Sequence, residues 1–262
     1  MFVHYTTRDD LFLLPGHIGI SEFEVTLGIA QELSGSIQAL QNIPGSIPHL
    51  LAETAKEIHA DYILIDMNPS LSSFNQNLLM TSDYFIIPTT PDCYSAMAID
   101  SLTKVIPKWY KWSNKAQQLL ILREASYPFP QVKPKFLGII VQNYRPRDGA
   151  PTRGFQQWID QINEKVTKDL YPALESHDMT LPKSAYELLN KDSYCLASIP
   201  DFNSLITMSQ EKQTPVYTLT DEQLGQSGTV LCQTKESQAK FEEIFLDLAN
   251  RVVQLTNYAN GN

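Results

Sequence analysis

Asp66 is the residue whose type and position most clearly suggest chemistry. It ends an apolar run, Tyr62 to Ile65, and Pro69 and Ser70 follow it closely. A continuous apolar run is typical of a strand buried in a parallel sheet, and open α/β sheets bind ligands at the carboxyl ends of their strands. The pattern predicts that Asp66 lies where a metal or phosphate would bind. The alternative is that Asp66 only caps a helix that begins near Ser70.

Other reactive side chains show no spacing that favours a second reaction. The five histidines lack metal-ligand spacing, so ordinary surface or partly buried roles are expected for them. Neither Ser70 nor Ser95 has partners in a motif of the serine hydrolase kind. The three cysteines are widely spaced without a Cys-x-x-Cys pair, which favours reduced thiols over a disulfide framework or a zinc site.

The elements that must position Asp66 alternate between strands and helices along the chain. Apolar runs predict strands at 62–66, 84–90, 136–144 and 194–200. Helical periodicity and capping signals predict helices at 21–33, 47–60, 70–82, 95–112, 154–174 and 237–255, with Pro107 kinking or ending the fourth. This alternation predicts an α/β fold with a doubly wound, mostly parallel sheet flanked by helices. We expect one domain over 1–262, with 174–193 and 220–236 as insertions or loops.

Composition and charge narrow the class of protein. A hydrophobic content of 43% argues for a globular chain and against disorder. A net charge of −9 argues against a surface that coats nucleic acid broadly, although it allows a local basic patch. No secretory signal and no apolar stretch long enough to span a bilayer is visible in these 262 residues. We therefore expect a cytoplasmic protein.

Several segments, taken in order, resemble the ParA/MinD-like ATPases, also called deviant Walker ATPases. The strongest resemblance is "DYILIDMNPSLSSFNQNLLMTSDYFIIPTTPDCYSAMAIDSL" (61–102), which is similar to the family's Walker B strand, Pro-Ser-Leu turn, helix and Ile-Ile-Pro strand. Looser likenesses are "LFLLPGHIGISEFEVTL", "FLGIIVQNY" and "IPDFNSLITMSQEKQTPVYTL". Together they cover most of residues 11–255. The resemblance implies a P-loop NTPase-like fold and a ParA/Soj-type partition protein.

The family's Gly-rich P-loop is the largest departure, because no Gly-Lys-Ser/Thr sequence occurs in these 262 residues. That loop cradles phosphates through backbone N–H groups and supplies a lysine and a Mg²⁺-binding hydroxyl. The resemblance begins after the point where the P-loop would lie. We expect either an N-terminally incomplete chain or a late-assigned start, with a relative that lost nucleotide chemistry as the alternative. By itself, residues 1–262 should bind ATP and Mg²⁺ poorly.

The resemblance also implies roles for individual residues. Asp66 would correspond to the Walker B aspartate, which orients Mg²⁺ through water beside the phosphates of ATP. Asn143 would read the adenine edge, although an asparagine that ends a strand is more often a turn former. Pro200 and Asp201 resemble the segment that packs around the base. Arg145, Arg147 and Arg153 lie in the late part of the fold that ParA-like proteins use for DNA contact; the alternative is a solvated loop.

As a whole, the resemblance implies an ATP-dependent homodimer that holds DNA non-specifically and answers to a ParB-like, centromere-binding partner. Such a cycle serves DNA segregation or cargo positioning, in the cytoplasm or on the nucleoid. The rival reading is a non-enzymatic interaction module that keeps the fold and binds no nucleotide. A MinD-like membrane role is disfavoured because the closing helix is acidic around "FEEIFLD", which repels anionic lipid headgroups.

Overall fold

The computed structural model describes the chain except for residues 1–2, 7, 34–35, 148, 188–193 and 260–262. Its described residues form two compact units. The first unit comprises Met1–Asp83 and Lys108–Pro134, and the second comprises Tyr84–Pro107 and Lys135–Asn262. Helix α4 (Cys93–Gln118) contributes to both units and continues through Pro107. Of the two effects expected of this proline, kinking or ending the helix, the second is therefore wrong.

The second unit is built on a parallel sheet in the order β3-β4-β7. Its strands are β3 (Tyr84–Thr89), β4 (Lys135–Tyr144) and β7 (Cys195–Pro200). The central strand β4 is buried along most of its length, because it has a strand on each side and helices over both faces. This arrangement confirms the predicted α/β fold with a parallel sheet flanked by helices.

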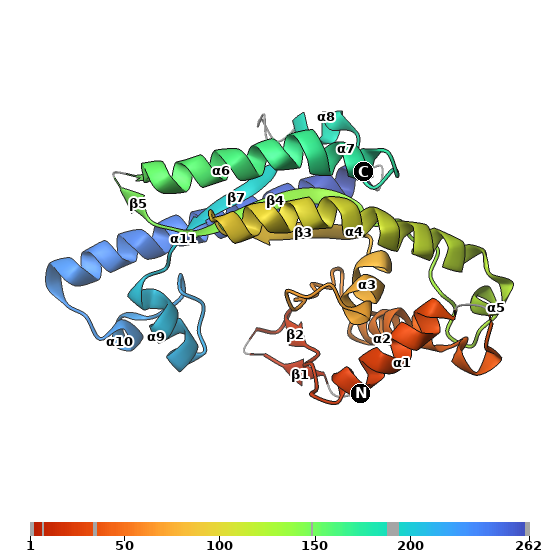
Figure 1. Cartoon of the computed structure of the whole chain (residues 1–262). Helices are drawn as coiled ribbons and strands as arrows, with labels where there is room; N and C mark the ends of the chain where they lie inside the picture. Colours follow the sequence, from red (N-terminus) through yellow and green to blue (C-terminus); the bar gives the residue numbers. More distant parts are fainter. Residues whose placement is uncertain (1–2, 7, 34–35, 148, 188–193, 260–262) are drawn as a thin grey trace. The chain divides into compact units, whose positions relative to one another are not determined.

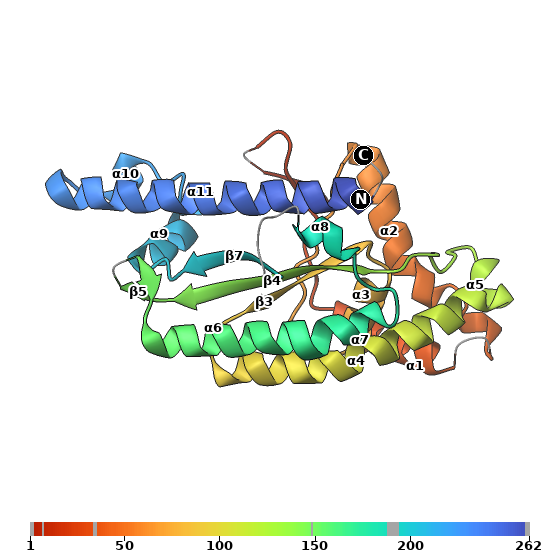
Figure 2. The same ribbon diagram turned by 90° about the horizontal axis from the view of Figure 1, so that it is seen from above.

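Helices cover the two faces of this sheet (Figures 1 and 2). The first half of α4 and helix α6 (Arg153–Lys165) lie on one face, and α11 (Gly228–Ala259) lies on the other. Lys165 Nζ lies 2.6 Å from Asp100 Oδ1 and thereby ties α6 to α4. A π-helical turn, Val166–Leu170, joins α6 to α7 (Tyr171–Glu175), and α8 (Lys183–Glu187) precedes β7.

A glycine in β4 allows the sheet to close tightly against the segment before β7. Gly138 has φ +150 and lies where the register of β4 against β3 shifts. A Cβ atom at this position would lie 2.4 Å from the carbonyl oxygen of Tyr194. Only glycine fits both this backbone conformation and this spacing.

The stretch 220–236, expected as a loop, is largely helical. It contains α10 (Asp221–Leu224) and the start of α11. A capping box explains where α10 begins: Gln223 N donates to Thr220 Oγ1 at 3.3 Å, and Thr220 N donates to Gln223 Oε1 at 2.9 Å. Leu224 then packs with Leu205 of α9 (Ser204–Lys212) and with Phe241 of α11. Of 174–193, expected as an insertion, residues 188–193 lie outside the described part.

The first unit is mainly helical, with α1 (Ile20–Glu32), α2 (Ile43–Ile58), α3 (Ser73–Met80) and α5 (Leu120–Arg123), and a short helical turn at Gln38–Leu40. Side-chain amides and hydroxyls tie α3 to its neighbours. Gln31 Nε2 donates to Ser73 O at 3.0 Å, and Ser73 Oγ donates to Glu24 O at 3.1 Å. These contacts make α3 a fixed support for the loop that precedes it.

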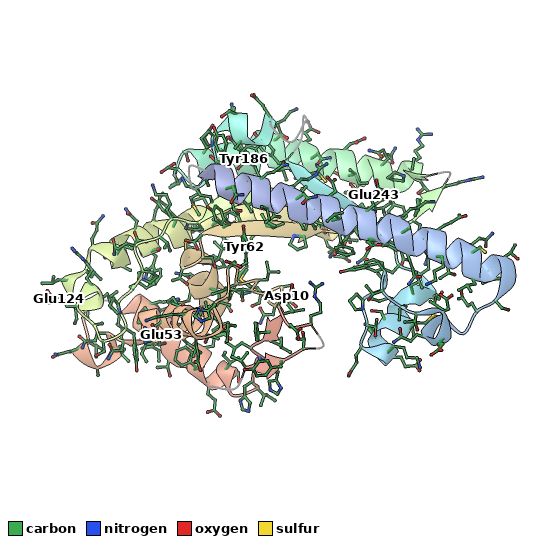
Figure 3. The ribbon with its side chains drawn as sticks, turned by 180° about the vertical axis from the view of Figure 1, so that it is seen from behind. Asp10, Glu53, Tyr62, Glu124, Tyr186 and Glu243 are labelled. Carbon is green, nitrogen blue, oxygen red and sulfur yellow. The ribbon has the colours of Figure 1, made fainter. Side chains whose placement is uncertain are left out.

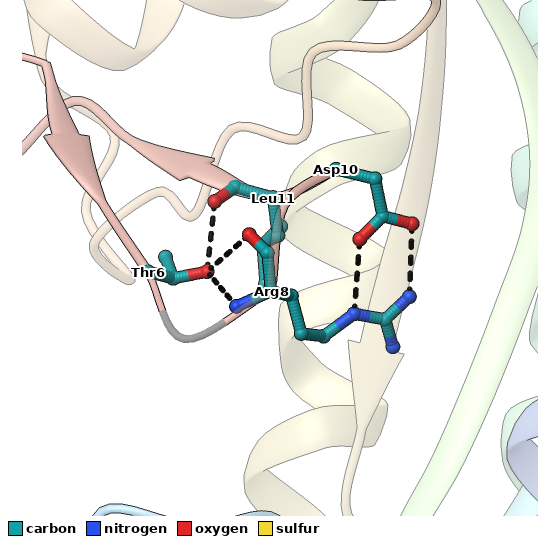
Figure 4. A network of polar contacts seen from close by, with 4 residues as sticks. All are labelled: Thr6, Arg8, Asp10 and Leu11. Carbon is teal, nitrogen blue, oxygen red and sulfur yellow. Dashed lines mark hydrogen bonds and ion pairs between the residues drawn. The ribbon is translucent and has the colours of Figure 1, made fainter.

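A small hairpin pairs β1 (His4–Tyr5) with β2 (Phe12–Leu13). Near it, the Thr6 hydroxyl donates to Leu11 O at 2.8 Å and accepts from Arg8 N at 3.1 Å (Figure 4). Arg8 also forms a bidentate ion pair with Asp10. The hydrogen bond from the Arg8 guanidinium lowers the pKa of the Asp10 carboxyl. Both side chains are exposed, so the pair shapes the turn more than it stabilises the fold.

No helix within the described residues is both long enough and apolar enough to cross a membrane.

Candidate functional site

The predicted strand that ends at Asp66 does not form. Residues 62–66 have no regular secondary structure between α2 and α3, and no strand among the described residues pairs with them. Leu64 is 90% exposed, and Tyr62, labelled in Figure 3, is 53% exposed. A strand is stable only when neighbouring chains satisfy its backbone N–H and C=O groups. The strand predicted from the apolar pattern at 62–66 is therefore wrong, because no strand in the described part of the chain lies beside it to bond its backbone groups.

Asp66 lies in this extended segment of the first unit with its side chain exposed. It does not cap the following helix, since the N-cap of α3 is Ser72, whose side chain accepts a hydrogen bond from Asn75 N at 3.3 Å. The helix predicted from residue 70 thus begins three residues later, at Ser73, and the alternative that Asp66 caps it is wrong. With capping assigned to Ser72, the ligand-binding role of Asp66 remains a prediction.

The donor set around Asp66 suits a Mg²⁺ ion shared with phosphates better than a metal held by protein alone. No group of three or more His, Cys, Asp or Glu side chains that could hold a metal is found in the described part of the chain. Mg²⁺ keeps several waters and is usually bound through one or two carboxylates plus substrate phosphates. Asp66 offers one exposed carboxylate of this kind, and the binding of Mg²⁺ by it stays a prediction.

The turn after Asp66 is closely hydrogen-bonded. Ser70 N donates to Asn68 O at 2.9 Å, which closes a three-residue turn around Pro69. Ser70 Oγ donates to Asn68 Oδ1 at 2.6 Å. The side-chain amide of Asn75 donates to Asn68 O and to Ser70 O, each at 2.7 Å. Neither Asn68 nor Asn75 is among the residues predicted for the site. A capping signature read from Ser72, three residues before Asn75, would have pointed to this part of α3.

The carboxyl edge of the sheet, in the second unit, brings together other predicted residues. Asn143 has φ +61 and lies where the register of β4 against β7 shifts, and its side chain is exposed. Asparagine tolerates this left-handed conformation better than most residues. Asn143 is thus a residue of β4 at the irregularity near its end and not part of a turn, and its contact with an adenine stays a prediction.

Pro200 and Asp201 lie beside the end of β4. Pro200 pairs with Tyr144, and Asp201 N donates to Tyr144 O at 2.9 Å. The Asp201 carboxylate accepts from Asn203 N at 2.9 Å, just before α9, and lies 3.4 Å from Arg145 Nε. Asp201 therefore already has structural partners. Its carboxylate orders the start of α9 and engages the first of the three predicted arginines.

The three arginines flank or belong to one small hairpin at this end of the sheet. The hairpin pairs β5 (Pro146–Arg147), labelled in Figure 1, with β6 (Ala150–Pro151). Arg145 and Arg153 lie just outside it in the sequence. All three arginines are exposed. Arg153 begins α6, where a positive charge is unfavourable beside the helix dipole and an approaching phosphate would be favourable. This arrangement suits an anionic partner.

Comparison with known proteins finds a similarity to one family in the N-terminal part of the chain. Residues 2–119 match the family AAA_31, described as an AAA domain. The match supports a ParA-like family. It covers Asp66 and the turn that follows it, whereas Asn143, Asp201 and the arginine hairpin lie beyond it. The parallel α/β sheet is consistent with the P-loop NTPase-like fold of such a domain.

One curated protein and one solved structure are also similar to this chain. The uncharacterised protein MJECL24 of Methanocaldococcus jannaschii is 30% identical over 167 residues, which are 63% of this chain and 49% of that protein. The match thus spans about half the length of this relative. The crystal structure of protein DIP2308 from Corynebacterium diphtheriae is similar with a TM-score of 0.46 and 18% identity, over 72% of this chain and 60% of that one.

Proposed function

We propose that this chain is a ParA-type partition ATPase, or the part of one that lacks the P-loop. Such a protein uses an ATP-dependent homodimer and non-specific DNA binding to segregate DNA or position cargo. The observation that carries the proposal is the AAA-domain match over residues 2–119, which includes Asp66 and its Pro-Ser turn. The exposed arginines at 145, 147 and 153 support the DNA-binding part. A ParB-like protein is the expected partner.

In this proposal each part of the chain has a separate task. Mg²⁺, when bound with ATP, would supply the charge stabilisation that phosphoryl transfer requires. Asp66 would hold the waters of that ion through its carboxylate, and Asn143, Pro200 and Asp201 would border the base. The arginine hairpin would contact DNA phosphates without reading sequence. Residues 1–262 contain no Gly-Lys-Ser/Thr motif that would supply the phosphate contacts of a P-loop.

The test uses the protein made from its own gene with a C-terminal affinity tag, so that any residues encoded before Met1 are retained. Intact mass identifies the chain, and ATP hydrolysis is measured with Mg²⁺. We expect Asp66→Asn to lower hydrolysis by about a hundredfold, because the amide keeps the shape and loses the charge. The matched control is Asp61→Asn, which neutralises a second exposed carboxylate of the same segment and should stay within about twofold of the parent.

Asp66→Asn with parental hydrolysis would reject the metal-holding role of Asp66. A natural protein that neither binds nor hydrolyses ATP would reject the ATPase proposal as a whole. That second result would favour the non-enzymatic interaction module with the same fold.

A further inference from the structure

The side-chain amide of Asn75, in α3, forms hydrogen bonds with the turn Asn68–Ser70 that follows Asp66. Its nitrogen faces the carbonyl oxygens of Asn68 and Ser70, both at 2.7 Å, and Asn68 Oδ1 at 2.9 Å. The residue is 3% exposed, although Asn68 and Ser70 are themselves exposed. One buried side chain of α3 thus holds both ends of a turn that otherwise faces solvent.

The orientation of this amide follows from its partners. Carbonyl oxygens can only accept hydrogen bonds, so the group between Asn68 O and Ser70 O must be the NH₂ of Asn75. The opposite atom, Asn75 Oδ1, is buried without a hydrogen-bond partner. Leaving a buried acceptor unsatisfied costs free energy, so this orientation of the Asn75 amide is unfavourable for its oxygen atom. The two hydrogen bonds that Asn75 Nδ2 donates to the turn offset this cost.

Helix α3 is itself well anchored, which makes the fastening effective. Asn77 Nδ2 donates to Pro44 O at 2.9 Å, and Ser73 Oγ donates to Glu24 O at 3.1 Å. Leu78, Leu79 and Met80 are buried. A turn tied to such a helix inherits its rigidity, whereas the extended segment before it has no strand pairing among the described residues.

We propose that Asn75 is a positioning residue: by locking the Asn68–Ser70 turn to α3, it sets where the Asp66 carboxylate is presented. The inference rests on the proposed function, because Asp66 needs a defined position only if it holds the metal of a nucleotide site. Asp66 lies two residues before the turn, so releasing the turn frees its backbone. Side-chain pre-organisation of this kind is how outer residues support a metal-holding carboxylate.

The experiment compares Asn75→Ala with Ser72→Ala in the natural, C-terminally tagged protein. Both variants remove a polar contact at the start of α3, but Ser72→Ala removes only the helix cap and leaves the amide of Asn75 in place. Asn75→Ser, which keeps a short hydroxyl unable to reach both carbonyls, replaces Asn75→Ala if that variant does not fold. Two quantities are measured: hydrogen exchange of the backbone amides 67–71, and the factor by which Mg²⁺ tightens ATP binding.

We expect Asn75→Ala to speed exchange at 67–71 by about tenfold or more and to reduce the Mg²⁺ factor by about tenfold. In Ser72→Ala both quantities should remain within about twofold of the parent. Unchanged exchange in Asn75→Ala, or equal loosening in Ser72→Ala, would overturn the inference. A loosened turn with an undiminished Mg²⁺ factor would also overturn it. If the parent shows no Mg²⁺-dependent ATP binding, the proposed function fails, and the exchange comparison still decides whether Asn75 holds the turn.

Discussion

Tyr186 offers a sharp test of how the second unit is held together. This residue of α8, labelled in Figure 3, is 6% exposed. Its hydroxyl donates to the carbonyl oxygen of Phe136 in β4 and accepts from Leu181 N at 3.2 Å. One hydroxyl therefore joins the central strand, the segment before α8 and the helix itself. The substitution Tyr186→Phe keeps the ring and removes only this junction.

The expected loss follows from the burial of the two partners. Phe136 is 0% exposed and Leu181 is 3% exposed, so water cannot readily replace the missing hydroxyl. A buried backbone group left without its partner costs about 1–3 kcal/mol. Two such groups, with partial relaxation, give an expected destabilisation of about 2–4 kcal/mol. For a unit of this size that corresponds to a melting temperature lower by about 5–12 °C.

The assay is thermal and urea unfolding followed by circular dichroism. The matched control is Tyr258→Phe. It removes a hydroxyl that also contacts α8, but this hydroxyl pairs with Ser184 Oγ at 2.8 Å on the surface. Because water can replace that partner, we expect a change within about 0.5 kcal/mol. A Tyr186→Phe protein no less stable than Tyr258→Phe would refute the reasoning that the buried hydroxyl satisfies both backbone groups.

Two further predictions concern DNA and pH. Replacing Arg145, Arg147 and Arg153 together by glutamine should weaken DNA binding equally for unrelated duplexes and make the affinity depend less on salt concentration. Fluorescence anisotropy measures both quantities. Unchanged affinity for DNA would favour the alternative that these residues belong to a solvated loop. Burial raises the pKa of Tyr171, Tyr186 and Tyr194 above the ordinary value of 10.0. Their neutral forms therefore stabilise the fold fully below pH 10, and this contribution is lost as the pH rises above 10 towards the raised values. Ultraviolet titration should show these three tyrosines ionising only as the protein unfolds, and reversible titration of all twelve tyrosines near pH 10 would contradict this.

Much of the fold could be predicted because its signals are local. The apolar runs that became β3, β4 and β7 were recognised from the sequence, as was the alternation with helices that led to a parallel sheet. Helical periodicity located α1, α6 and the later part of α11. The helices within 220–236 were not predicted, although the capping box of Thr220 and Gln223 is a local signal for the start of α10.

The candidate site depended more on contacts between distant residues. The run before Asp66 has the composition of a buried strand, but composition cannot supply the neighbouring strand whose backbone groups it must bond. Asn143 could be placed at a strand end from its pattern, whereas its left-handed conformation follows from the register shift against β7.

The sequence by itself determined several helices and the strands β3, β4 and β7, and it marked Asp66 and the arginines as candidate ligand-binding residues. Only the tertiary structure decided that Ser72 caps α3, that Asp201 meets Arg145, and that Asn75 fastens the turn after Asp66. The physical reason is that hydrophobic periodicity is written along the chain. The partners of a polar side chain are instead set by which backbone groups the folded chain leaves within hydrogen-bonding distance.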